Sequence, residues 1–414
     1  MADAAYRGPE ALLGVDVGTT KVAAVVAGRG DEVTILGAAT APCSGLRRGV
    51  VVDIPDTTRA IREAVTKAQR MAGVELAAAW VGVTGQHISC LNSEAEIQIA
   101  RANRQITWDD VERVMGLAVR AVSIPADRQM LHAISRGFIV DGEPHVRNPV
   151  GLSASRLAVV THIVTASRNL VENVAKCVEQ AGLEVAELVA EPLAAADAVL
   201  SEEQERLGTL LVDVGGGTTD LAVFLDGSIA FTGAVPAAGN HVTHDIAVAL
   251  GLTHPVAEQL KLSHGCARSE LVPKDEMIEL PGEGGAETVS RRFLAEVIEA
   301  RVQETFRLVA EEVGRSEVRW PLPGGAVLTG GGSLLPGIAA VAEAQLGCRV
   351  RLGRPVVASG PVELLESPAL ATGVGLVHYA HREAQTRRAE PKRSPRVLPL
   401  LGRVVAWVKD LFTS

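Results

Sequence analysis

The chain has 414 residues, enough for two or more domains with substantial hydrophobic cores. Hydrophobic residues make up 47% of the sequence and charged residues 21%, which is typical of a globular α/β protein. The net charge of −9 argues against general nucleic-acid binding, so no nucleic-acid partner is expected.

The five cysteines are scattered and form no CxxC pair, a pattern that favours reduced thiols in the cytosol. Residues 1–7 contain no apolar signal core, and no stretch reaches the roughly 18 apolar residues that a membrane-spanning helix needs. We therefore expect a cytoplasmic chain that does not cross a bilayer.

The first 85 residues carry the pattern of a small α/β domain. Two apolar strands, 12–17 and 22–26, flank the turn Gly18-Thr19-Thr20-Lys21. A helix is expected to begin near Pro55, capped by Asp56 or Thr57, and residues 80–85 are predicted to form a buried strand that ends in a turn.

Residues 86–161 change in character and predict a compact α+β insert. Short strands are expected at 87–92 and 96–100, then a helix that opens at 106–111. Two more strands are expected at 130–134 and 137–142. The apolar segment 157–164 then predicts a buried strand at the end of the insert.

The second half repeats the opening pattern. Helices are expected from Ser167 to Gly182 and from about 189, and then the strand 211–214 leads into the turn Gly215-Gly216-Gly217-Thr218. Residues 239–313 are rich in helix, and 326–329 is a short strand followed by Gly330-Gly331-Gly332-Ser333. A helix is expected over 370–383, and the segment that follows has the composition of a tether.

Both glycine turns suit the binding of a triphosphate, because backbone N–H groups without obstructing side chains can point at phosphate oxygens. Neighbouring threonine hydroxyls add donors, and Lys21 adds a positive charge. The expected phosphate-binding residues are Gly18, Thr19, Thr20, Lys21, Gly215, Gly216, Gly217 and Thr218. Asp16 and Asp213 each precede a turn, and two facing carboxylates suit a Mg²⁺ ion that keeps several of its waters.

A Walker A loop is excluded, because no Gly-Lys-Ser/Thr follows and each turn leads into a strand rather than a helix. A single hairpin of this kind would be better explained as a plain β-turn. The pair, together with the third glycine cluster 330–333 between a strand and a helix, favours a nucleotide whose adenosine lies against that cluster.

These motifs resemble those of the actin/Hsp70/sugar-kinase superfamily and, more narrowly, of the FtsA family of bacterial cell-division proteins. The segments that carry the resemblance are 14–21, 124–128, 148–152, 258–261 and 329–337, within a similarity that runs from Leu12 to the C-terminus. The insert 86–161 is the most discriminating feature, because it resembles the family's 1C subdomain, which other members of the superfamily lack at this place.

The resemblance implies an α/β fold of duplicated actin-like (ribonuclease H-like) domains around an ATP cleft, with a 1C (SHS2-like) insert and a C-terminal amphipathic helix. The implied subdomains are 1A (8–85, 162–205 and 365–382), 1C (86–161), 2A (206–232 and 312–364) and 2B (233–311), followed by a flexible linker (383–396) and a membrane-targeting helix (397–414).

The resemblance also implies further site residues. Gly239, Glu258 and Lys261 would lie on the ribose and adenine side, and Ser333 belongs to the adenosine motif. Glu191 matches a position where related proteins place a water-orienting glutamate; the alternative is an ordinary acid favoured by the positive end of a helix dipole. At most a weak ATPase is implied.

The C-terminal tail carries an amphipathic pattern. Residues 381–414 hold eight basic and three acidic residues. On a helical wheel six apolar side chains fall within about 120°, with Trp407 at the border, and this pattern favours a helix lying in the interface of an anionic membrane over one buried in a core. The predicted membrane-contacting residues are Leu401, Val404, Val405, Trp407, Val408, Leu411 and Phe412.

Taken together, the resemblance implies an ATP-binding protein that polymerises and tethers FtsZ filaments to the inner face of the cell membrane at the division site. It would also help to recruit later division proteins. Subdomain 2B would receive the C-terminal peptide of FtsZ, with Arg291, Arg292 and Arg301 as candidate contacts or as ordinary solvated charges. The alternatives are a sugar or acetate-type kinase and an MreB-like filament.

Overall fold

The computed structural model describes residues 11–30, 32–100, 105–280, 288–357 and 365–389. Its first sheet has the strand order β11-β6-β1-β2-β3. Strand β1 (Ala11–Val17) pairs antiparallel with β2 (Lys21–Arg29), which pairs antiparallel with β3 (Val33–Pro42). On its other side β1 runs parallel to β6 (Ala78–Val83), and β6 runs parallel to β11 (Glu184–Ala190).

The second large sheet repeats this plan, in the order β14-β13-β12-β17-β18. Strand β12 (Thr209–Val214) pairs antiparallel with β13 (Thr219–Leu225), and β13 with β14 (Ser228–Val235). The parallel neighbours are β17 (Ala326–Thr329) and β18 (Val350–Leu352). Identical order and direction in both sheets confirm the predicted duplication, and the central strands are buried along their whole length because both faces are covered.

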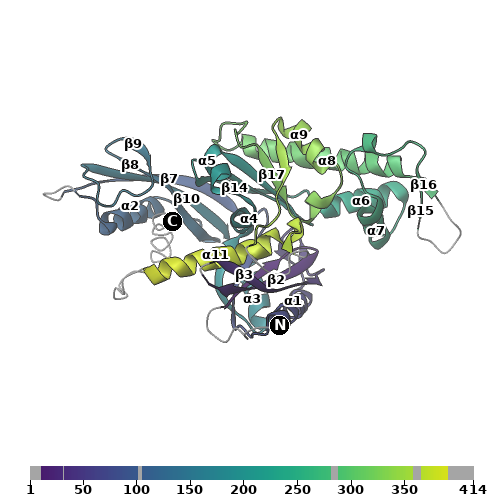
Figure 1. Cartoon of the computed structure of the whole chain (residues 1–414), viewed down its shortest axis with the longest axis horizontal. Helices are drawn as coiled ribbons and strands as arrows, with labels where there is room; N and C mark the ends of the chain where they lie inside the picture. The colour runs from purple at the N-terminus through teal and green to yellow at the C-terminus, as the bar shows by residue number, and fades with distance from the viewer. Residues whose placement is uncertain (1–10, 31, 101–104, 281–287, 358–364, 390–414) are drawn as a thin grey trace.

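Helices cover the sheets and join the two halves. They are α1 (Ile54–Ala72), α3 (Arg168–Gln180), α4 (Glu191–Val199), α5 (Glu202–Leu207), α9 (Ile338–Leu346) and α11 (Ala371–Ala389). Helix α11 packs against α4 and β1 and crosses the middle of the molecule (Figure 1). The N-cap of α1 is Asp53, not Asp56 or Thr57 as predicted, because the Asp53 carboxylate accepts the N–H of Asp56 at 2.8 Å.

The insert forms its own four-stranded sheet, with the order β7-β10-β8-β9, at one end of the elongated molecule (Figure 1). Its elements are β7 (Ser89–Gln98), α2 (Trp108–Arg120), β8 (Arg128–Val140), β9 (Glu143–Val146) and β10 (Arg156–Ser167). Two pairs of predicted short strands are therefore single long strands. The predicted strand 157–164 is part of β10, and the insert continues past its predicted end at 161, because β10 pairs with β7 and β8 as far as Ser167.

The insert also packs on the second half of the chain. His162 of β10 is fully buried, with Nδ1 2.9 Å from the Asn92 side-chain oxygen and Nε2 2.9 Å from the Thr232 hydroxyl of β14. The Asn92 amide donates to the Ala230 carbonyl at 3.3 Å. The insert therefore contacts the second sheet although the chain enters and leaves it through the first domain.

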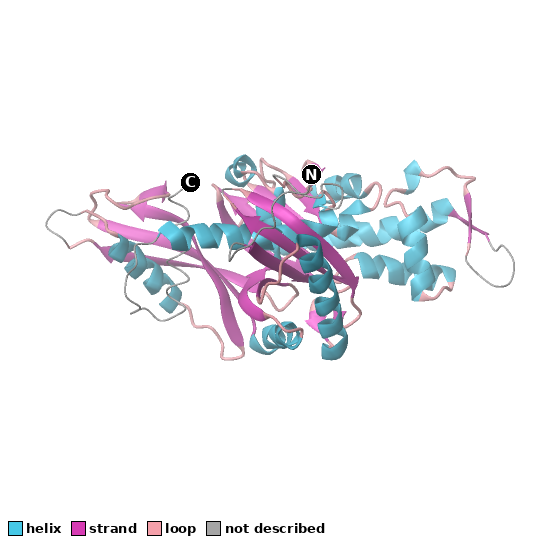
Figure 2. Ribbon diagram, turned by 60° about the horizontal axis from the view of Figure 1, so that its bottom comes forward, coloured by secondary structure: helices cyan, strands magenta, loops and turns pink. Residues whose placement is uncertain are grey.

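The opposite end of the molecule is mostly helical (Figure 2). It contains α6 (Gly239–Leu250), α7 (His254–His264), the long helix α8 (Arg291–Gly314) and a small hairpin of β15 (Met277–Glu279) and β16 (Thr288–Ser290). This arrangement agrees with the helix-rich pattern predicted for residues 239–313.

The C-terminal helix is longer than the sequence predicts. Helix α11 continues to Ala389, into the segment 383–396 that was predicted as a flexible linker. Its extension is stabilised by burial of His381, Glu383 and Ala384 against the body. The predicted membrane-targeting helix 397–414 lies outside the described residues. Within the residues that the structure describes, no helix is long and apolar enough to cross a membrane.

Candidate functional site

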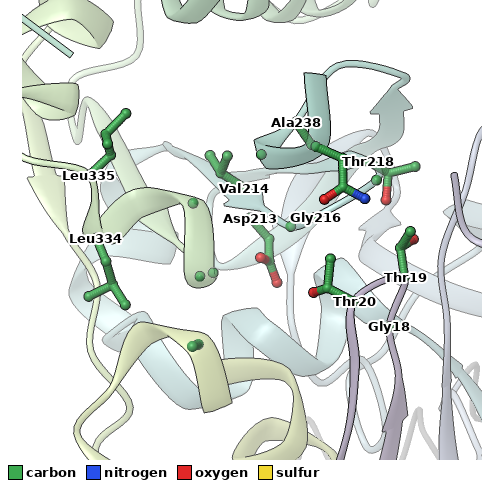
Figure 3. A pocket seen from close by; sticks show the side chains of 18 of the residues that line it. Gly18, Thr19, Thr20, Asp213, Val214, Gly216, Thr218, Ala238, Leu334 and Leu335 are labelled. Carbon is green, nitrogen blue, oxygen red and sulfur yellow. The ribbon is translucent and has the colours of Figure 1, made fainter. Parts of the chain in front are cut away.

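A cavity of about 500 Å³ lies between the two large sheets, and all three glycine motifs line it. In Figure 3 the turn that carries Thr19 and Thr20 faces the loop at Gly216, and the carboxylate of Asp213 points into the space between them. Segments almost two hundred residues apart in the sequence are thus brought to one site, as predicted.

The two hairpin turns have the same geometry. In the first turn the N–H of Gly18 donates to the Lys21 carbonyl at 3.1 Å, and in the second the N–H of Gly215 donates to the Thr218 carbonyl at 3.0 Å. This equivalence aligns Thr19-Thr20 with Gly216-Gly217. The threonines of one turn therefore do not correspond to those of the other.

The two turns are in direct contact. A Cβ atom at Gly216 would lie 2.5 Å from the Thr20 methyl carbon, and one at Gly217 would overlap the Thr19 hydroxyl. Because no Cβ fits at either position, the second turn needs glycine where the first carries threonine. The two glycine turns therefore meet across the cleft.

The third glycine loop lies against the second turn. Gly330 adopts φ +82°, and a Cβ there would overlap the carboxylate of Asp213. Gly330, Gly331 and Gly332 line the cavity. Ser333 does not: its side chain is buried and its hydroxyl donates to the Gly330 carbonyl at 2.7 Å, closing the loop on itself.

Four buried carboxyl groups line the cavity: Asp16, Glu191, Asp213 and Asp220. Burial raises the pKa of Asp16 to about 7, and the nearby Asp213 adds to this rise. Burial likewise raises the pKa of Asp213 to about 6 and of Asp220 to about 7. The pKa of Glu191 is raised by burial and by Asp16, Asp220 and Asp213. The site therefore concentrates negative charge that a cation would neutralise.

Lys21 supplies positive charge beside the aspartates. Its ammonium donates to the carbonyl of Ala369, just before helix α11, and burial lowers its pKa. Thr372, in the first turn of α11, donates its hydroxyl to Asp213 at 2.9 Å. The start of α11 is thus bonded to both glycine hairpins.

A second polar cluster lies where α6 and α7 meet. The Lys261 ammonium donates to the Glu258 carboxylate at 2.7 Å, to the Thr243 hydroxyl at 2.9 Å and to the Gly239 carbonyl at 3.3 Å. Thr243 also donates to Glu258. The predicted nucleotide-binding residues Gly239, Glu258 and Lys261 therefore line the same cavity, and Lys261 is bonded to both of the others.

The sequence did not single out several residues of the site. Asp220 lies directly opposite Asp213 in the β12–β13 pairing, and its carboxylate accepts the hydroxyls of Thr84 at 2.5 Å and Thr218 at 3.1 Å. Asp220 ends the second motif, so its place in the motif was a usable signal. The roles of Thr84 and Thr372 depend on contacts with distant segments, so no local sequence signal indicated them.

Two buried carboxylate oxygens, Glu191 Oε1 and Asp220 Oδ1, accept no hydrogen bond from the residues that the structure describes. The described part of the chain also holds no group of three or more His, Cys, Asp or Glu side chains placed to grip a metal ion. A Mg²⁺ ion that keeps most of its waters fits this set of donors, because it needs only one or two carboxylates and its waters would satisfy the remaining oxygens.

The candidate partner arginines lie on α8 and are not among the residues that line the cavity, although Val302 of the same helix is; each of them forms ion pairs. Arg291 contacts Glu276 at 2.8 Å, and Arg292 contacts Glu296 at 3.6 Å. Arg301 pairs with Asp245 and with Glu304.

The duplicated sheets, the shared cavity and the extra four-stranded domain define an actin-like protein with an insert. Solved structures with this fold include the PilM–PilN type IV pilus biogenesis complex (TM-score 0.61, 18% identity, covering 89% of this chain and 98% of that one). Another is MreB5 of Spiroplasma citri bound to ADP (TM-score 0.56, 15% identity, covering 92% of this chain and 99% of that one). At these identities the similarity shows the fold alone.

Sequence comparisons go further. The family model for cell division protein FtsA matches residues 210–375, and the model for the SHS2 domain inserted in FtsA matches residues 85–165. Cell division protein FtsA of Pseudomonas aeruginosa is 39% identical, covering 99% of this chain and 100% of the relative. The Bacillus subtilis protein of the same name is 35% identical, covering 91% and 84%.

This chain belongs to the FtsA family of cell division proteins. The family predicted from the sequence motifs is confirmed, and so is the actin-like fold with an SHS2 insert.

Proposed function

We propose that this chain binds ATP with Mg²⁺ in the cavity between its two large sheets. The observation that carries the proposal is the convergence of both glycine turns, the third glycine loop and the buried carboxylates on one cavity. The turns and Lys21 would hold the phosphates, Asp16 and Asp213 would hold the hydrated ion, and the Gly239–Glu258–Lys261 cluster would contact the ribose. Glu191 would orient the attacking water of a weak ATPase.

Equilibrium binding of a fluorescent ATP analogue with Mg²⁺ tests this proposal. Lys21→Met should weaken binding at least about tenfold, because it removes a buried positive charge beside the phosphates. The matched control is Lys67→Met, since Lys67 is exposed on α1 and pairs only with Glu63. Binding that survives Lys21→Met unchanged, or an absence of binding by the unaltered chain, would contradict the proposal.

The same protein is proposed to act as a membrane tether, using the amphipathic segment 397–414 on the inner face of the cell membrane. Six apolar side chains on one face can contribute several kcal/mol at about 25 cal/mol per Å² buried, and basic residues add up to about 1 kcal/mol each near anionic lipid. Several copies in a polymer would bind cooperatively.

Co-sedimentation with anionic vesicles tests the tether. Deleting 397–414 should abolish pelleting with lipid and leave ATP binding intact. A second variant carries Val404→Glu and Val408→Glu in the full chain. It keeps the length of the chain but disrupts the apolar face, so it should also lose pelleting with lipid. A truncated chain that still pellets with lipid would refute the tether.

FtsZ is the proposed partner, through its C-terminal peptide bound to subdomain 2B. Exposed apolar side chains gather among the elements of this subdomain, and they are Val248, Leu262, Leu271, Met277 and Phe293. Arg301 is held by Asp245 and Glu304, but partly exposed ion pairs contribute only about 0–1 kcal/mol, so an acidic peptide can replace these partners.

Arg301→Ala should therefore weaken binding of an FtsZ tail peptide, measured by fluorescence anisotropy. Arg307→Ala is the matched control, because Arg307 lies on the same helix with more than half of its side chain exposed and a similar pair to Glu311. Equal losses from both variants would argue against a specific role for Arg301. Filament formation and recruitment of later division proteins at the division site complete the proposed function.

A further inference from the structure

The insert reaches the back of the nucleotide cavity through one buried histidine. His132 lies on β8, 6% exposed, and its Nε2 accepts the backbone N–H of Ala190 at 3.0 Å. Ala190 is the last residue of β11, and the next residue, Glu191, begins α4 and lines the cavity. A side chain of the insert is therefore bonded one residue away from a carboxyl of the site.

The geometry of the sheet explains why this bond matters. Strand β11 is the outermost strand of the first sheet, so only β6 pairs with it. An N–H group at such an edge needs a partner from elsewhere once it is buried, and Ala190 is fully buried. No side chain caps the start of α4. His132 supplies the acceptor and so fixes the backbone at the point where the chain turns from strand into helix.

Other contacts hold the imidazole of His132 and leave room for Glu191. The ring of Tyr379, on α11, meets the His132 ring edge-on with 6.0 Å between their centroids, and the Tyr379 hydroxyl donates to Glu187 at 3.3 Å. On the cavity side, a Cβ at Gly82 would lie 3.0 Å from Cγ of Glu191. The Glu191 side chain is therefore confined by β6 on one side, while its backbone is fixed through His132.

We propose that His132 of the insert is a positioning residue for Glu191, acting through the Ala190 N–H and supported by Tyr379 of α11. The inference rests on the proposed nucleotide site, and it deepens it by assigning the SHS2 insert a direct structural role there. His132 touches neither nucleotide nor metal. Its loss would displace Glu191 rather than remove a ligand contact, so turnover would fall while nucleotide affinity would hold.

Three variants of the full-length chain test the proposal. His132→Leu removes the acceptor and keeps an apolar side chain in the space. His132→Gln keeps an acceptor oxygen in a similar place and is the rescue variant. His162→Leu is the matched control, because His162 is a buried histidine on the neighbouring strand β10 that bonds Asn92 and Thr232, far from Ala190 in its contacts.

Two measurements decide the outcome: hydrogen exchange of the Ala190 amide, and single-turnover hydrolysis of Mg·ATP alongside its dissociation constant. We expect His132→Leu to speed Ala190 exchange at least about tenfold and to slow turnover about tenfold, with affinity changed less than about twofold. His132→Gln should stay close to the unaltered chain, and His162→Leu should change neither readout.

The proposal is overturned if Ala190 exchange is unchanged in His132→Leu, if His132→Gln fails as badly as His132→Leu, or if His162→Leu reproduces the loss. An unaltered chain that does not bind ATP would refute the proposed function instead. Exchange at Ala190 decides the inference even if the unaltered chain binds ATP without hydrolysing it.

Discussion

Replacing Asp16 with asparagine should stabilise the nucleotide-free protein while removing one carboxylate of the proposed Mg²⁺ site. Asp16 is buried near Asp213, and its pKa is raised from 3.8 to about 7. Because the folded state binds the proton more tightly than the unfolded chain does, stability falls as the pH rises from about 4 to about 7 and is level above that. Asparagine imitates the protonated form and cannot ionise.

The magnitude follows from the rise in pKa. Each pKa unit corresponds to about 1.4 kcal/mol, so ionising Asp16 costs the folded state about 4 kcal/mol at pH 8. At pH 5 the folded group is still protonated while the unfolded one is ionised, and the cost is about 2 kcal/mol. The variant should therefore gain roughly 2–3 kcal/mol more at pH 8 than at pH 5.

Urea unfolding of nucleotide-free protein at both pH values measures this difference. Asp56→Asn is a control of opposite sign, because hydrogen bonds from Arg59 and Ser44 lower the pKa of Asp56 to about 2. That variant should lose stability at both pH values and gain none at pH 8.

The result that would refute the reasoning is an equal change in Asp16→Asn at pH 5 and pH 8, or a net loss at pH 8. The urea midpoint measured with added Mg·ATP is a second test of the same variant. Mg·ATP should raise the urea midpoint of the unaltered chain at pH 8 and leave that of Asp16→Asn unmoved, because the metal-holding carboxylate is gone.

Three further outcomes are expected. Gly216→Ala should weaken ATP binding, because its Cβ would lie 2.5 Å from the Thr20 methyl carbon. Thr20→Ser removes that methyl group, so adding it to Gly216→Ala should restore part of the affinity. If the effects of the two substitutions on ATP affinity are additive in a double-mutant cycle, the contact is contradicted. Thr372→Val should weaken Mg²⁺ binding more at pH 6.5 than at pH 8. The Thr372 hydroxyl lowers the pKa of Asp213, so its loss leaves more of this carboxyl protonated at the lower pH. Isothermal titration calorimetry measures the affinity, and an equal loss at both pH values would be contrary evidence. Mg·ATP binding should release protons at pH 6 and fewer at pH 8, measured in buffers of different ionisation enthalpy, and proton uptake would be inconsistent with raised carboxyl pKa values.

The duplication could be predicted from the sequence because it leaves a local signal. An apolar strand, one aspartate and a glycine turn recur in order, and each half of that pattern is complete within a dozen residues. Strand directions then follow from the turns, since a tight hairpin makes antiparallel neighbours. The insert was also visible, because its composition and strand pattern differ from those of its surroundings.

What the sequence did not give is the pairing between distant segments. Strand β10 has the same apolar pattern whether it joins the first domain or the insert, and only its two pairing partners decide between them. Ser333 looks like a nucleotide contact from its motif, but the hydroxyl closes its own loop. In the same way, apolar residues past Leu370 predict a helix, but its length depends on burial against the body.

The aligned threonines show how local resemblance can mislead about equivalence. Thr19-Thr20 and Thr218-Thr219 are alike in sequence, but the hydrogen bonds that close each turn place Thr19-Thr20 opposite Gly216-Gly217. By the same alignment Lys21 corresponds to Thr218, and Ala23 corresponds to Asp220.

These differences make the two hairpins complementary rather than identical. Where one turn has threonine the other has glycine, so the two turns can touch. A side chain in place of either glycine would collide with a threonine, and glycine in place of either threonine would leave a gap. The first hairpin carries the ammonium of Lys21, whereas the second carries the extra carboxylate of Asp220, which accepts a hydrogen bond from Thr84, just after β6. The contact across the cleft therefore depends on two copies that have diverged in size and in charge. A chain in which the second turn was replaced by a copy of the first could not close this cleft.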